Sequence, residues 1–88
     1  YVPIYSVKVS TSALSCPYNG TLDTVYLMTL DYNTYVSSGN QLLAGMTLYE
    51  NSGGTLLTGY TNVYDNNWLA VSHLNSSTGV VGNVYLEC

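Results

Sequence analysis

The sequence predicts an all-β fold, a small antiparallel β-sandwich or immunoglobulin-like domain with an N-terminal strand that can be exchanged between subunits. No window keeps a 3.6-residue apolar period between helix caps. Strand-favouring Val, Tyr and Thr alternate with turn-forming Gly, Asn and Ser at short intervals. The only two cysteines, Cys16 and Cys88, enclose most of the 88 residues, a length that suits one domain.

The first expected strand covers residues 1–14 and precedes both cysteines. Tyr5, Val7, Val9 and Ala13 fall on one face at period two, opposite a row of serines and a lysine. Pro3 has no N–H to donate, which requires an edge or a strand start. The apolar row must be buried, either in the sheet of its own domain or in the open sheet of a neighbouring copy.

Both pairings remain open, and exchange between copies is the more specific hypothesis. It makes residues 1–15 a donor strand with its linker and residues 16–88 a disulfide-closed β domain. The predicted subunit interface consists of the apolar side chains of the first strand: Val2, Ile4, Tyr5, Val7, Val9 and Ala13.

The rest of the chain reads as short strands separated by turns. Asn19-Gly20 marks the first turn. Residues 21–30 form a strand with apolar side chains on both faces, which favours a central position, and residues 31–40 form a polar loop. Further extended pieces are expected at residues 46–49, 55–58, 63–64, 68–74 and 80–86.

The two cysteines match no CxxC or metal-binding pattern and predict a Cys16–Cys88 disulfide, with two free thiols as the alternative. A loop of this length stabilises a domain by roughly 4 kcal/mol in the chain-entropy treatment. A disulfide indicates an extracellular or periplasmic protein. Because the chain begins at Tyr1 and not at Met, we expect a processed protein or a fragment.

The charge balance excludes several partners. The net charge is −4 and Lys8 is the one cation, so the chain has no basic surface for nucleic acid or for anionic membranes. No apolar run approaches the roughly 20 residues of a membrane helix, and we expect no membrane span. Ten Tyr and no Phe predict many half-buried rings on sheet faces or in an interface.

No residue pattern indicates an enzyme. Ser72, His73 and Asp65 lack a nucleophile-elbow motif, and neighbouring strand residues such as Ser72 and His73 point to opposite faces. No carboxylate pair favours glycoside hydrolysis. Asp65-Asn66-Asn67 has too few carboxylates for calcium and is typical of an Asx turn, so we expect no cofactor or metal.

Two patterns point to sugars. Asn19 and Asn75 begin Asn-x-Ser/Thr sequons in expected turns and are candidate glycosylation sites, although chance sequons are common in such a composition. Trp68 with Tyr60 and Tyr64 can form an aromatic platform for a glycan. The simpler interpretation places Trp68 in the core of its strand.

The order of motifs from Cys16 to Cys88 resembles small β domains near the C-termini of Bacteroidetes surface and fibre-like proteins. The motifs are an opening Cys, a Gly-x-x-Leu-Tyr element at Gly45–Tyr49, and a Gly-Val-Val strand at Gly79–Val81 that leads to a closing Cys. The resemblance implies an extracellular, disulfide-closed module for fibres, adhesion or display, without catalytic residues. The N-terminal strand lies outside the shared pattern.

Together these features predict a structural subunit of a bacterial extracellular filament at the cell surface. Identical copies would assemble head to tail by N-terminal strand donation, because a heterologous contact that does not close into a ring makes a filament. The alternative is a carbohydrate-binding, adhesive module of a surface or phage-tail fibre, with glycans as partners.

Overall fold

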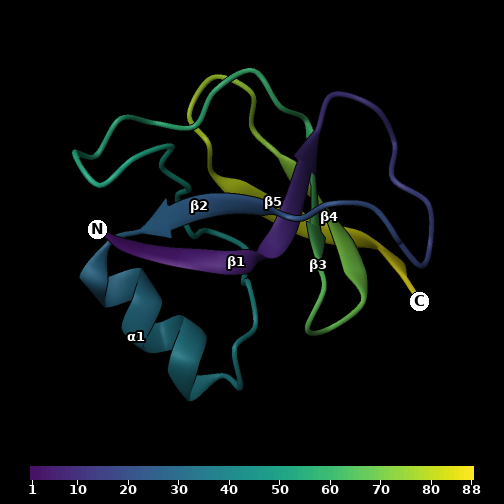
Figure 1. The fold of residues 1–88 in the computed structure, drawn as a ribbon, viewed down its shortest axis with the longest axis horizontal. Coiled ribbons are helices and arrows are strands. Elements are labelled where there is room, and N and C mark those ends of the chain that lie inside the picture. The colour runs from purple at the N-terminus through teal and green to yellow at the C-terminus, as the bar shows by residue number, and fades with distance from the viewer.

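The computed structural model describes all 88 residues, Tyr1–Cys88, and contains five strands and one helix. The strands form one antiparallel sheet in the order β2-β1-β3-β4-β5 (Figure 1). The prediction of a small antiparallel all-β domain is confirmed. In chain order the elements are β1 (Val2–Ser10), β2 (Asp23–Leu27), α1 (Thr29–Ser37), β3 (Asn62–Asp65), β4 (Ala70–Leu74) and β5 (Val81–Glu87).

A bulge divides β1 into two halves that serve different neighbours. Val2–Ile4 pair with β2, Val7–Ser10 pair with β3, and the register shifts between Ile4 and Val7. Ile4 and Val7 are therefore both buried although they are three residues apart, and Tyr5 is turned outward with 65% of its surface exposed. Figure 1 shows β1 turning sharply near its middle.

Two expectations for the first strand are wrong. Tyr5 does not share a buried face with Val7 and Val9, because the bulge breaks the period of two. The strand also ends at Ser10 and not at Leu14, so Ala13 lies exposed in the connection to β2.

At the position of Pro3 a backbone N–H would have no partner in the sheet, so the missing N–H of proline costs no hydrogen bond. Its partner Tyr26 exchanges both backbone hydrogen bonds with Tyr49 on the other side of β2, each at 2.8 Å. The Pro3–Tyr26 pair is therefore a non-hydrogen-bonded pair, and β3 reaches β1 only from Val7 onward. This placement agrees with the strand-start requirement for proline.

The second strand lies at an edge of the sheet and not at its centre. It ends at Leu27, before the predicted limit. The apolar residues on its two faces are therefore not explained by a central position in the sheet. Val25 and Leu27 are buried in the core, while the backbone of Tyr26 is covered by Tyr49.

Helix α1 replaces the predicted polar loop. It has no side-chain N-cap, which removed the usual sequence sign of a helix start. Tertiary contacts hold it instead, because Tyr35 is buried and the Asp31 carboxylate accepts the backbone N–H of Thr47 at 3.3 Å. Gly39, with a φ of +83°, ends the helix in the left-handed conformation that favours glycine.

The two faces of the sheet are covered by different parts of the chain. The main core joins strand residues such as Val7, Leu27 and Val63 to buried residues of α1 and of the segment 42–57. On the opposite face, the buried Tyr64 contacts the ring of Tyr18, which belongs to the connection between β1 and β2, with 5.8 Å between ring centroids.

The predicted Cys16–Cys88 disulfide is present, with 5.5 Å between the two Cα atoms. It joins the β1–β2 connection to the residue that follows β5, so β1 lies outside the covalently closed loop. A disulfide is typical of an oxidising compartment. Helix α1, with 9 residues, is too short to span a membrane.

Candidate functional site

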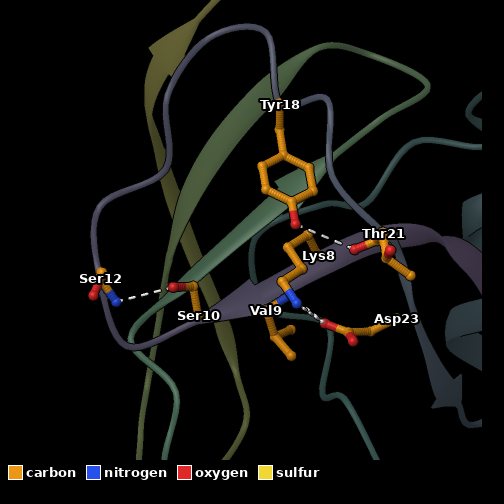
Figure 2. A network of polar contacts seen from close by, with 7 residues as sticks. All are labelled: Lys8, Val9, Ser10, Ser12, Tyr18, Thr21 and Asp23. Atoms are coloured by element: carbon orange, nitrogen blue, oxygen red, sulfur yellow. Dashed lines mark hydrogen bonds and ion pairs between the residues drawn. The ribbon is translucent and has the colours of Figure 1, made fainter.

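Two contacts between β1 and β2 meet at the side chain of Asp23. Its Oδ2 accepts the backbone N–H of Val9 at 3.0 Å and lies 3.5 Å from Nζ of Lys8 (Figure 2). The ladder between β1 and β2 ends at the Val7–Asp23 pair. The carboxylate therefore takes the place of the next backbone acceptor and extends the ladder by one hydrogen bond.

The predicted interface residues divide into two groups. Ile4, Val7 and Val9 are buried in the core of their own chain, and Val2 is half-buried beside β2. Tyr5 and Ala13 are exposed. The buried apolar side chains of the first strand, Ile4, Val7 and Val9, are therefore covered within this chain, in the strand position that joins β2 to β3.

An open groove of about 440 Å³ lies where the β1 bulge, α1 and the β3–β4 turn meet. Its β1 wall is formed by Pro3–Ser6, with Leu22 beside it, and the rings of Tyr32 and Tyr35 come from α1. The remaining wall consists of three asparagines: Asn40, Asn66 and Asn67.

Hydrogen bonds fix the base of the groove. The hydroxyls of Ser6 and Tyr35 are bonded at 2.8 Å. The side-chain amide of Asn67 donates to the Tyr35 hydroxyl oxygen at 3.1 Å and to the carbonyl oxygen of Asn40 at 3.1 Å. Side chains from β1, α1 and the β3–β4 turn are thus held in one arrangement.

The buried carboxylate of Asp65 supports the asparagine walls from behind. Its Oδ1 accepts the N–H groups of Asn67 and Trp68, at 3.0 and 3.3 Å, which forms the predicted Asx turn. Its Oδ2 accepts the N–H of Leu42 at 2.9 Å and so ties down the segment that follows Asn40. Burial raises the pKa of Asp65, and these three N–H groups oppose that rise.

The predicted aromatic platform does not form. Trp68 and Leu69 lie in the β3–β4 turn and not in a strand, and 49% of the Trp68 surface is exposed, so its interpretation as a core residue is wrong. Its indole N–H donates to the carbonyl of Gly39 at 3.2 Å. Tyr64 is fully buried, while Tyr60 lies half-buried against the main core.

The other candidate residues lie apart from the groove lining. His73 is exposed and stacks on Tyr85 with 4.4 Å between ring centroids, whereas Ser72 is buried on the opposite face. Asn19 and Asn75 are both exposed. No three His, Cys, Asp or Glu side chains gather where they can hold a metal ion.

The groove was missed because its lining residues come from separate stretches of the sequence. The turn at Asp65-Asn66-Asn67 was recognisable, but nothing local places it beside Tyr5 or Tyr35. The Ser37-Ser38-Gly39 end of α1 was the one readable sign of the helix that supplies the tyrosines.

Comparison of the chain with known protein families, curated proteins and solved structures finds no match.

Proposed function

We propose that this chain is a structural module of an extracellular fibre, in which β1 of one copy completes the sheet of the next copy. One observation carries the proposal: β1 is the first strand of the described chain, yet it joins β2 to β3 within the sheet. It also precedes Cys16, so β1 can change partners without breaking the disulfide-closed part.

The exchanged arrangement reuses contacts already present in the single chain. If β1 leaves, β2 and β3 each lose a partner strand, and β1 of another copy can form the same pairs in the same register. The stretch 11–15 between β1 and Cys16 spans at most about 17 Å when extended, which allows β1 to reach a copy in contact. Repetition of this heterologous contact produces a filament.

Concentration decides between the two arrangements. Folding back is intramolecular and corresponds to an effective concentration in the millimolar range for a short linker. A dilute chain therefore keeps its own β1. Exchange becomes competitive where subunits are crowded, as in a fibre.

The setting of the proposal rests on sequence features together with the disulfide. The low charge content and the motif resemblance to Bacteroidetes surface domains support an extracellular, cell-surface location. This location is part of the proposal. The proposed role is structural and assigns no catalytic residue.

Electron microscopy and light scattering of concentrated protein test this proposal. The full chain is compared with a chain that starts at Ser15, alone and with a synthetic peptide of residues 1–14. We expect only the full chain to form filaments. The truncated chain should stay monomeric and should regain native β-structure when the peptide is added. A full chain that stays monomeric at millimolar concentration contradicts strand exchange.

A second candidate, an adhesive carbohydrate-binding module of a surface or phage-tail fibre, is favoured by the groove at the β1 bulge. A glycan in this groove would be bound by side chains, and its binding needs no exchange of strands.

A further inference from the structure

We propose that the groove at the β1 bulge binds an uncharged saccharide, of about one or two sugar units. This site deepens the second candidate function and rests on it, and it does not depend on strand exchange. Its volume of about 440 Å³ falls in the range of small-ligand sites.

The lining residues have the chemistry that recognises sugars. The rings of Tyr5 and Tyr32 provide faces for the C–H side of a pyranose, and the asparagines provide amides for its hydroxyls. None of the lining side chains carries a charge. A charged ligand would thus have no counter-charge in the groove.

Tyr5 is the most informative of these residues. It lies in β1 between the buried residues Ile4 and Val7, yet 65% of its own surface is exposed. The bulge at this point removes Tyr5 from the core, and the residue lines the groove. Bulges commonly re-aim a side chain beside a functional site.

Some polar side chains of the groove are already hydrogen-bonded within the chain, and others are not. The Tyr35 hydroxyl and the Asn67 amide nitrogen already have partners at the base. The side-chain amide of Asn66 forms no hydrogen bond within the chain, and neither does that of Asn40, so both are available to a ligand. A fixed base with free groups at the rim lowers the ordering cost of binding.

The nearest buried carboxylate does not change the class of ligand. Asp65 lies behind the turn and its two oxygens are occupied by backbone N–H groups. The chain as a whole carries a net charge of −4, which further disfavours an acidic sugar.

Nuclear magnetic resonance of the ¹⁵N-labelled full chain tests the proposal. Cellobiose, maltose and lactose are titrated, with glucuronic acid as the charged comparison. We expect at least one neutral disaccharide to shift the amide signals of Ser6, Asn66 and Asn67, with a dissociation constant on the order of 1 mM. Glucuronic acid is expected to leave them unchanged.

Four substitutions at three exposed positions sharpen the result. Tyr5→Ala should weaken binding roughly tenfold and Asn66→Ala roughly fivefold, because each removes a single stacking or hydrogen-bonding contact. Tyr5→Phe should keep most of the affinity, and Asn83→Ala on β5 is the matched control without effect. Either no shift with any neutral disaccharide, or shifts that map outside the groove and ignore Tyr5→Ala, overturns the proposal. Filament formation is scored separately, so its failure does not affect this outcome.

Discussion

Tyr64 carries a buried side-chain hydroxyl that has no hydrogen-bond partner. The residue is fully buried in β3, between the sheet and the ring of Tyr18. Burial of a hydroxyl without a partner costs free energy, while the ring itself contributes apolar contact.

We therefore expect Tyr64→Phe to raise the free energy of unfolding, by about 1 kcal/mol. Tyr35→Phe is the matched control, because the Tyr35 hydroxyl has two partners and its removal should instead cost about 1–3 kcal/mol. Urea unfolding followed by circular dichroism measures both. A loss of stability in Tyr64→Phe would contradict the assignment of an unpartnered hydroxyl.

Asp65 gives the fold a specific pH dependence. Burial raises the pKa of this carboxyl above its ordinary 3.8, so the folded chain holds a proton that the unfolded chain has already lost. The stability contribution of Asp65 is therefore largest below pH 3.8 and falls as the pH rises through the folded pKa.

The variant Asp65→Asn removes this titration. As the pH rises from about 3.8, the unfolding free energy of the wild type should fall relative to that of Asp65→Asn, and the difference should then become constant. Unfolding titrations between acidic and neutral pH measure the difference. A wild type that gains stability relative to the variant over this range would show that hydrogen bonding to the carboxylate outweighs its burial.

At the scale of elements, strand positions were more predictable than the helix or the bulge. The strand class of β3, β4 and β5 follows from local composition, because Val and Tyr favour a half-buried pleated surface. Helix α1 has no side-chain N-cap and is held by Asp31 and Tyr35, whose partners lie far away in the sequence. The bulge between Ile4 and Val7 leaves no local sign, so the predicted face of β1 was wrong at Tyr5.

The contact of β1 with β2 provides a prediction at the same scale. Asp23→Ala should lower the free energy of unfolding by about 1–2 kcal/mol, because the N–H of Val9 loses its acceptor. Lys8→Met should change it by less than about 1 kcal/mol, because the 3.5 Å ion pair is partly exposed. Equal effects in the two variants would contradict the role given to the Val9–Asp23 hydrogen bond.

At the scale of the whole molecule, the disulfide was predictable and the groove was not. Two cysteines without a metal pattern leave few alternatives, and the Cys16–Cys88 bond closes a separation of 72 residues. The groove needs β1, α1 and the β3–β4 turn to meet, and that arrangement arises only from the complete fold.

Loss of the disulfide should have a large effect on so short a chain. We expect the double substitution Cys16→Ser, Cys88→Ser to lower the free energy of unfolding by about 4 kcal/mol, because the unfolded chain regains the entropy of an open loop. Denaturant unfolding of the wild type and the variant measures the change. A difference below about 1 kcal/mol would contradict this chain-entropy account of the disulfide.

Strand exchange itself is tested most directly by cross-linking the Pro3–Tyr26 pair, which lies between β1 and β2. In the variant Pro3→Cys, Tyr26→Cys the two positions face each other as a non-hydrogen-bonded pair, which suits a disulfide. We expect concentrated, oxidised protein to give a ladder of covalent oligomers on a non-reducing gel, with positions 3 and 26 joined between copies. The single variant Pro3→Cys is the control and should give no species beyond a dimer. Monomers with positions 3 and 26 joined within one chain, at every concentration, would contradict the exchange of β1.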